Sequence, residues 1–428
     1  MNREEMLEFA AAAVDAAGTP DAVAELTEVR DASVRFSRNR ITRNTDVFTR
    51  KLRLTAGRDR KKVSVSTDKI AFEELKTTAI KAERLLDTAS PDPEYMPPVS
   101  AGQKYREIPE AWNQEIAGCP AEMRMDAAVK VLNTASSKGY EAGGVCTMSV
   151  RKRAVYTSTG NGAFHRRTDS SMSFTMARGL ASSYRALSGT GWNELDISDA
   201  VSSVADEVEM SMNGEDLEPG SCSIILEPEA TWNLVIFLPW IMSAREADQG
   251  LSVFSGMEGK KVTGEGMTLS SRLHGGRPGI PFNEEGLPAG DTVWIEKGVL
   301  RNLPCDRFTA KKTGRPALFF PETMDMEGGE GSTADLVSSV KRGVLIRRFR
   351  YIRLVDRKTL KLKGLTRDGV FLVENGRIVR PVKNFRWSWR LLELFSSIEN
   401  IGTPVRKTPG MIPPVVISPQ TNPFTDKE

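Results

Sequence analysis

Residues 366–385 read TRDGVFLVENGRIVRPVKNF, and this stretch decides how the C-terminal half of the chain is interpreted. Two β-rich pieces, Val370–Glu374 and Arg377–Val382, flank Asn375-Gly376. Both turn residues tolerate the positive φ of a tight primed turn, and Asn-Gly between apolar runs is the strongest short-range hairpin signal. The stretch therefore predicts a β-hairpin.

The bulk composition is that of a globular protein large enough for two or three domains. Of its 428 residues, 39% are hydrophobic and 27% are charged. The longest apolar run, Leu234–Met242, is far shorter than a membrane span and contains Pro239. The charged start of the chain, Met1-Asn-Arg-Glu-Glu, predicts neither a signal peptide nor a lipid anchor.

The cysteines and the net charge bear on the cellular compartment and on the class of protein. The four cysteines are scattered without a C-x-x-C pair, which argues against a structural zinc site and against a secreted disulfide scaffold. They are Cys119, Cys146, Cys222 and Cys305. We therefore expect a cytoplasmic, reducing setting. A net charge of +3 does not by itself indicate a nucleic-acid protein.

The sequence divides into two small N-terminal units joined by a linker. The first unit, residues 1–90, combines two amphipathic helices with short strands. Its predicted elements are helices Glu4–Ala17 and Asp68–Ala89 and strands Ala22–Val29, Ser33–Arg38, Asp46–Ala56 and Lys62–Val65. Residues 91–122 are proline-rich and predict a linker. The second unit, residues 123–213, has predicted helices Met125–Ser136 and Ser198–Met212 and strands near Gly144–Val150, Ala154–Ser158 and Asp169–Ala177.

Residues 214–428 form the third unit, which is dominated by short strands and glycine-rich turns. Cys222–Leu226 predicts a buried strand, whereas the six prolines of Thr403–Glu428 predict an extended segment along the surface. The predicted fold class is α+β, with two small N-terminal α/β units followed by a larger sheet-rich C-terminal domain.

The residues that could hold a metal are few. The chain has two histidines, His165 and His274, and neither belongs to H-E-x-x-H or H-E-x-x-x-H, whose spacing places two imidazoles on one helical face. A composite site of His165, His274 and Cys305 is conceivable, but nothing in the spacing supports it. We interpret both histidines as structural.

Other catalytic groups are equally isolated. Glu246 and Asp248 lie two residues apart, so on a helix they would point in different directions, and we interpret them as surface charges. No G-x-S-x-G elbow accompanies the two histidines, which argues against a serine triad. The cysteines are expected to be small core hydrophobes rather than nucleophiles.

Two further patterns have a functional and a structural interpretation. The loop Glu327–Gly331 opens a predicted helix, Ser332–Val340, and could cradle phosphate, but its glutamates favour a helix cap built on Ser332 and Asp335 instead. The run Arg347–Lys363 carries eight Lys or Arg with Phe349 and Tyr351 interleaved. Such a strip could bind RNA or single-stranded DNA, although we favour a solvated strand face or a face toward an acidic partner or peptide.

Several stretches resemble one known family. Residues 369–387, GVFLVENGRIVRPVKNFRW, closely resemble the signature near the C-terminus of TldD/PmbA-type proteins, which are subunits of two-chain metallopeptidases that trim peptides and unfolded polypeptides. Residues 33–68 are similar to the first family domain, and residues 155–179 are a looser match to the second. The resemblance implies the family fold over nearly the whole chain.

The same resemblance implies where a metal would be bound. In TldD-type chains, a helix carrying H-E-x-x-x-H follows the first strand of the C-terminal domain and precedes an F-S-G turn, and a cysteine near the C-terminus is the third ligand. This chain keeps the flanking segments Ile224–Ala230 and Ser252–Gly256. Between them Trp232–Asp248 has no histidine and contains Pro239, and no cysteine follows Cys305. We therefore assign this chain no catalytic, metal-binding or cofactor-binding residue.

Three hypotheses follow. The first is a non-metal PmbA/TldE-like subunit that pairs with a zinc-bearing TldD-like chain, or with itself, and supports a chamber for peptide substrates. The second is a stand-alone, non-catalytic peptide- or nucleic-acid-binding protein on the same scaffold. The third is an independent hydrolase with unrecognised ligands.

Overall fold

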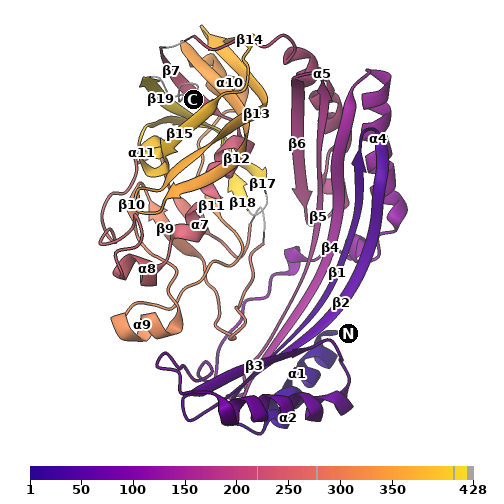
Figure 1. Cartoon of the computed structure of the whole chain (residues 1–428), viewed down its shortest axis with the longest axis vertical. Helices are drawn as coiled ribbons and strands as arrows, with labels where there is room; N and C mark the ends of the chain where they lie inside the picture. Colours follow the sequence, from indigo (N-terminus) through magenta and orange to yellow (C-terminus); the bar gives the residue numbers. More distant parts are fainter. Residues whose placement is uncertain (219, 276–277, 408–409, 422–428) are drawn as a thin grey trace.

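The structure is a computed structural model that describes residues 1–218, 220–275, 278–407 and 410–421. Figure 1 shows a long curved sheet built from the N-terminal half, with the C-terminal domain beside it. Strand exceeds helix in both halves, so the α+β class is confirmed.

The N-terminal sheet has six antiparallel strands in the order β3-β2-β1-β4-β5-β6. They are β1 Asp21–Ser37, β2 Arg40–Arg58, β3 Lys61–Thr67, β4 Glu141–Thr157, β5 Gly162–Arg178 and β6 Ala181–Gly189. The first three strands come from residues 1–90 and the last three from residues 123–213. Because β1 pairs with β4, the two predicted units are the two halves of one continuous sheet.

The strands are longer than the sequence suggests. We predicted a break after Val29, but β1 continues through Arg30 and Asp31. Arg30 binds Asp46 of β2 at 2.6 and 2.9 Å, and Asp31 lies 3.4 Å from an Arg151 nitrogen of β4. Arg30 and Asp31, whose polarity suggested a turn, are therefore strand residues that pair with charged side chains on the neighbouring strands.

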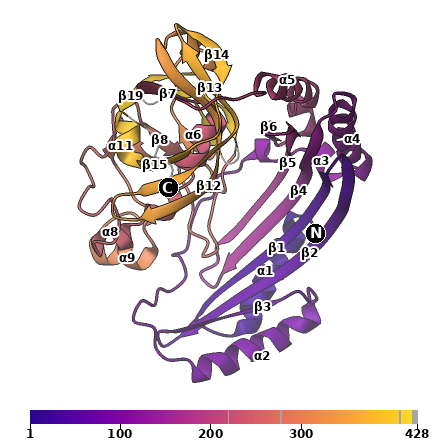
Figure 2. The ribbon, with the colours of Figure 1, turned by 45° about the horizontal axis from the view of Figure 1, so that its top comes forward.

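Four helices cover one face of this sheet, as the view in Figure 2 also shows. Alternate residues of β1 face them: Ala22 and Leu26 belong to the apolar cluster beneath α1 and α2, and Val34 and Phe36 belong to the cluster beneath α4 and α5. The period of two along a strand fixes this division of faces. These helices are α1 Arg3–Ala17, α2 Phe72–Thr88, α4 Ala121–Ser137 and α5 Ile197–Met210.

The opposite face of the sheet looks toward the C-terminal domain. Val23 and Val155 on this face pack with Phe282 of that domain and with Tyr105 of the linker. The Tyr105 hydroxyl donates a hydrogen bond to the Gly286 carbonyl at 2.8 Å. The predicted linker thus contacts both halves near Tyr105, whereas its short α3 Gln114–Ala117 packs against Met148 of β4 on the helix-covered face of the sheet.

The C-terminal domain is built on a seven-stranded mixed sheet with the path β14-β13-β12-β7-β19-β16, and β15 pairs with β13. Its central strand β7 runs parallel to β12 and antiparallel to β19. The strands are β7 Ser221–Leu226, β12 Arg342–Asp356, β13 Lys361–Glu374, β14 Arg377–Pro381, β15 Arg386–Arg390, β16 Ile398–Ile401 and β19 Val415–Thr421.

The predicted hairpin is confirmed as the β13–β14 connection. Glu374 pairs with Arg377, and the two turn residues have φ of 49° at Asn375 and 77° at Gly376. Positive φ at both central positions is the requirement of a type I′ turn. A Cβ at Gly376 would also lie 2.6 Å from the Ser338 carbonyl oxygen, so only glycine fits there.

One prediction for the C-terminal stretch is wrong. We expected Thr403–Glu428 to lie extended along the surface, but β19 lies inside the sheet, and Val415, Val416 and Ile417 are buried. Its run of β-branched residues suits a strand buried on both faces. Residues 408–409 and 422–428 lie outside the described part of the chain.

The remaining elements are short. A four-stranded sheet in the order β10-β9-β8-β11 flanks the main sheet, and β17 pairs with β18. Its strands are β8 Leu269–Ser271, β9 Thr292–Glu296, β10 Val299–Leu300 and β11 Asp325–Met326; the other pair is β17 Val405–Lys407 and β18 Gly410–Ile412. The helices are α6 Pro228–Val235, α7 Leu238–Ile241, α8 Ala244–Asp248, α9 Arg307–Thr313, α10 Thr333–Ser338 and α11 Leu391–Ser396. Among the described residues, we find no helix that combines the length and apolarity needed to cross a membrane.

Candidate functional site

The segment that follows β7 is folded into three short helices, α6, α7 and α8. Pro228 and Pro239 occupy first-turn positions of α6 and α7, where a missing N–H costs nothing. Pro239 therefore ends the first helix, as predicted. The apolar side chains of α6 and α7 point into the domain core; they include Trp232, Leu234, Val235, Leu238 and Ile241.

The first turn of α6 carries a carboxylate that already has a cationic partner. Glu229 Oε2 lies 3.2 Å from the ammonium nitrogen of Lys407 on β17, and the Asn233 amide donates to Glu229 Oε1 at 3.3 Å. Asn233 Oδ1 in turn accepts the backbone N–H of Phe349 at 3.0 Å. The Glu229 and Lys407 side chains are only 16% and 12% exposed, so water screens their attraction weakly. A lysine from near the C-terminus thus neutralises the one α6 carboxylate at this site.

Beside this ion pair, β6 of the N-terminal sheet contributes a tyrosine. The Arg348 guanidinium lies 3.4 Å from the centre of the Tyr184 ring, a cation–π contact. Arg348 also binds Asp368 at 3.0 Å, and Asp368 accepts a hydrogen bond from Ser182 at 2.8 Å. Burial raises the pKa of the Tyr184 phenol, and the Glu229 carboxylate raises it further. The phenol is therefore neutral at physiological pH.

A second ionic network lies between the same two halves. Glu207 of α5 accepts hydrogen bonds from Ser183 and from Arg185 at 2.6 Å, and it pairs with Arg347 of β12. Arg347 Nε also lies 3.6 Å from Glu227, at the start of α6. The contact between the sheet edge β6 and the C-terminal domain is therefore rich in charges that are nearly all paired.

Comparisons with known proteins identify the kind of domain that carries these contacts. The profile described as "PmbA/TldA metallopeptidase C-terminal domain" matches residues 219–421. A protein named "Metalloprotease" from Methanothermobacter thermautotrophicus is 25% identical over 249 residues, which cover 53% of this chain and 54% of that protein. Residues 219–421 of this chain are a domain of the TldD/PmbA family.

Further relatives extend the likeness. A "Metalloprotease TldD homolog" from Buchnera aphidicola (subsp. Acyrthosiphon pisum) is 28% identical over 178 residues, covering 38% of this chain and 36% of that protein. The aligned part thus spans about half, or less, of these curated relatives. TldE from Thermococcus kodakarensis superposes with a TM-score of 0.86 at 19% identity over 97% of this chain and 98% of that one. A putative modulator of DNA gyrase from Bacteroides thetaiotaomicron gives 0.86 at 19% identity, over 98% and 99%. These two structures show the fold.

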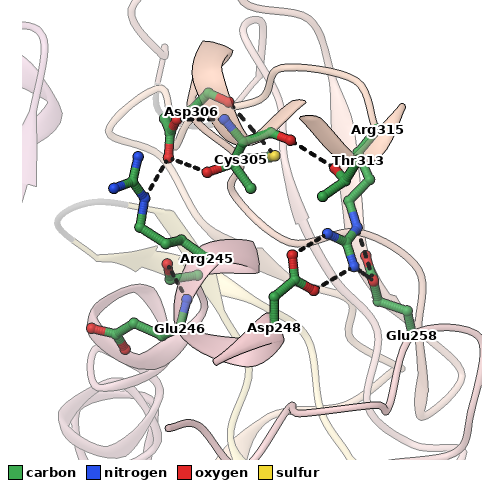
Figure 3. Close-up of polar contacts among 10 residues, drawn as sticks. Arg245, Glu246, Asp248, Glu258, Cys305, Asp306, Thr313 and Arg315 are labelled. Carbon is green, nitrogen blue, oxygen red and sulfur yellow. Dashed lines mark hydrogen bonds and ion pairs between the residues drawn. The ribbon is translucent and has the colours of Figure 1, made fainter. Parts of the chain in front are cut away.

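The two carboxylates of α8 point apart, as Figure 3 shows. Asp248 binds the Arg315 guanidinium in two contacts of 2.6 and 2.8 Å, whereas Glu246 pairs with Arg357. Arg315 also contacts Glu258 at 2.6 Å, and its hydrogen bonds to Asp248 lower the pKa of the Asp248 carboxyl. The prediction that Glu246 and Asp248 diverge is correct, but each stabilises a tertiary contact rather than standing free in solvent.

Cys305 lies above α8 in the same view and is buried. Burial raises the pKa of its thiol, as it does for the other cysteines, and raises that of Cys146 to about 12. All four cysteines are free and buried. A buried thiol with a raised pKa is a poor nucleophile and a poor metal ligand.

The two histidines lie in different surroundings. His165 of β5 is buried; burial and the nearby Arg167 and Arg153 lower its pKa to about 4. His274 is about half exposed, and its Nδ1 lies 2.6 Å from a Glu110 carboxylate oxygen. Within the described residues, the structure groups no three His, Cys, Asp or Glu side chains in a way that could hold a metal ion.

Contacts in the structure show what the glycine-rich loop and the basic strip do. Ser332 and Asp335 form the predicted capping box at α10, with the Ser332 N–H donating to Asp335 at 2.7 Å. The basic strip is not one surface: Arg347 and Arg348 face the N-terminal sheet. Tyr351, Arg353, Lys361 and Lys363 instead line an open groove.

Sequence reasoning missed the residues that meet at the contact between the halves, above all Glu229, Lys407 and Asp368. One signal for Asp368 was available. Asp-Gly inside a strand run favours a bulge, and Asp368 and Gly369 have φ of 57° and 118° where the β12–β13 register shifts. The bulge turns Asp368 toward Arg348.

Proposed function

We propose that this chain is a non-metal, TldE-like subunit of a two-chain metallopeptidase complex that acts on peptides or unfolded polypeptides. The observation that carries the proposal is the Lys407–Glu229 ion pair on α6. The family resemblance places metal ligands on the helix after the first C-terminal-domain strand and near the C-terminus, which here are α6 and the β17 region. An ammonium group between these segments repels a divalent cation.

The described residues do not fit a zinc ion. The α6 segment offers one carboxylate that is already neutralised, and no histidine lies on α6, α7 or α8. Zinc prefers imidazole, thiolate and carboxylate ligands that converge on one point. We therefore place the zinc in a TldD-like partner, where the metal would activate water for amide hydrolysis.

In this proposal the chain contributes surface rather than chemistry. It would form part of the wall of the substrate chamber and hold a peptide in extended form, a binding mode that sheet edges support. Association with a partner chain or with a second copy would complete the chamber. We propose a cytoplasmic location, which suits four buried free thiols.

Metal analysis and co-purification test the proposal. We expect the chain purified alone to carry far less than one zinc per molecule, and to associate with a co-expressed TldD-like chain that contains H-E-x-x-x-H. Peptide cleavage should appear only in the mixture and should disappear when the partner's motif is mutated. Stoichiometric zinc in this chain alone, or no association with such a partner, would contradict the model.

The second candidate function, a stand-alone binding protein, is favoured by one observation. A groove on the C-terminal domain, away from α6, is lined by cations that have no acidic partner among the described residues. Native mass separates the two candidates, since a monomer that binds ligand without a partner supports the second.

A further inference from the structure

The basic groove lies on the exposed face of strands β12, β13 and β15. It encloses about 690 Å³ and is lined by Tyr351, Arg353, Lys361, Lys363, Arg386 and Trp387, among others. The residues Arg353, Lys361, Lys363 and Arg386 are all exposed. In the part of the chain that the structure describes, these four cations have no acidic partner. The groove therefore concentrates positive charge in a protein whose net charge is only +3.

The strand register places like charges opposite one another. Arg353 pairs with Lys363 across β12 and β13, and Lys361 pairs with Arg390 across β13 and β15. Like charges directly opposite destabilise a sheet. Among the described residues, Arg390 is the one of these four side chains that has a carboxylate close by, Glu393 at 3.0 Å. The groove thus keeps an uncompensated repulsion that an anionic ligand would relieve.

Three other cations of the same strip have acidic partners. Arg347 pairs with Glu207, Arg348 with Asp368, and Arg357 with Glu246. Each of these lies outside the groove lining. Positive charge therefore remains on the groove face, whereas Arg347, Arg348 and Arg357 are neutralised.

The groove favours carboxylates over a nucleic-acid strand. Nucleic acid needs successive exposed aromatic rings for base stacking. Tyr351 is 62% exposed, but Arg350 already lies 5.1 Å from its ring centre, and Trp387 is 1% exposed and stacked on Trp389. Lys361 and Lys363, two residues apart on one strand face, are separated by about 7 Å, which is the spacing of alternate side chains in an extended peptide.

We propose that the basic groove binds an acidic segment of the extended polypeptide substrate. The inference rests on the proposed function as a peptide-handling subunit and adds a preference for substrates with alternating Asp or Glu. The four free cations pair with the carboxylates, and the exposed Tyr351 and Val355 side chains offer apolar contact at one end.

Fluorescence anisotropy on the full, isolated chain tests the inference. The probes are a labelled peptide of alternating glutamate and serine, the same peptide with glutamine, and a labelled oligothymidylate. Of the three probes, we expect only the glutamate peptide to bind. Its affinity should fall steeply with salt because exposed charges are screened. The double variant K361Q/K363Q should weaken binding about 10-fold, since each exposed ion pair contributes a factor of a few.

The matched control is K76Q/K81Q, which removes the same charge from the exposed face of α2 at the far end of the molecule. It should bind the glutamate peptide like the wild type. The single variant K363E should weaken binding of the glutamate peptide more than K363Q does. This comparison distinguishes an effect of charge from an effect of unfolding the groove. Equal binding by wild type and K361Q/K363Q overturns the inference, as does tighter binding of oligothymidylate. Because the assay needs no partner chain, its failure leaves the co-purification test of the proposed function intact.

Discussion

The substitution Glu207→Gln should loosen the contact between the N-terminal sheet and the C-terminal domain. The Glu207 side chain is 10% exposed and neutralises Arg347, which is 13% exposed, as well as Arg185. The glutamine side chain has the same size as that of glutamate and can still accept a hydrogen bond from the Ser183 hydroxyl. The substitution therefore removes the charge and changes little else. Arg347 is then left with Glu227, whose oxygen lies 3.6 Å away.

The magnitude follows from the burial of the pair. Removing one partner of a fully buried ion pair costs about 3–5 kcal/mol because the other charge stays desolvated. Arg185 is 29% exposed and Glu227 remains near Arg347, so we expect a smaller loss of about 2–3 kcal/mol in the free energy of unfolding. Against a typical total of about 5–15 kcal/mol, this is a large shift.

Urea unfolding followed by tryptophan fluorescence measures the change, with the midpoint and slope fitted together. The control is Glu209→Gln on the same helix, an exposed residue whose contact is the Tyr140 hydroxyl at 3.1 Å. It should cost less than about 0.5 kcal/mol. A Glu207→Gln protein that unfolds at the same midpoint as Glu209→Gln would refute the view that this network holds the two halves together.

Four other predictions have distinct expected outcomes. Buried His165 prefers the neutral form, so its contribution to stability is complete above pH 6.5 and is lost as the pH falls toward 4. Between pH 7 and pH 5 the free energy of unfolding of the wild type, measured by urea titration, should fall by up to about 2 kcal/mol. The variant His165→Gln should lack this pH dependence. Gly376→Ala should lower stability by about 1–3 kcal/mol in thermal unfolding, whereas Asn375→Gly changes it by a few tenths; an equal effect of both would contradict the type I′ turn. Arg315→Gln, which removes the two-point contact to α8, should cost about 1 kcal/mol by urea midpoint, and no change would mean that the contact is not formed in solution. Lys363→Gln should instead raise stability by about 0.2–1 kcal/mol by relieving like-charge repulsion, and a loss would argue against that repulsion.

Local chemistry explains which parts of the fold the sequence predicts well. The Asn375-Gly376 turn and the capping box at Ser332 depend on a few adjacent residues, and both are confirmed. The breaks at Pro239 and the helices α1, α2, α4 and α5 were likewise visible in proline positions and in apolar spacing.

Long-range pairing explains what the sequence does not reveal. Nothing local states that Leu26 of β1 pairs with Ala154 of β4, so the two N-terminal units looked separate. The same holds for β19, whose prolines suggested a surface segment although Ile417 is buried against β7.

The candidate site likewise has features that the sequence reveals and features that depend on long-range pairing. The absence of histidine from residues 232–248 can be read directly from the sequence. The partner that neutralises Glu229 cannot, because Lys407 reaches it only once β17 has packed against α6. A dense ionic contact between distant segments has no local pattern by which it could be recognised.

The position of β19 has a consequence for how the chain is made. In the sheet of the C-terminal domain, Ile225 of β7 pairs with both Leu345 of β12 and Val416 of β19. The ribosome delivers β7 long before it delivers β19, so one edge of an apolar strand stays open throughout the synthesis of everything between them. Such an edge can pair with other chains, and contacts so far apart in sequence form slowly. The nascent C-terminal domain is therefore prone to aggregation until β19 has emerged and closed the sheet.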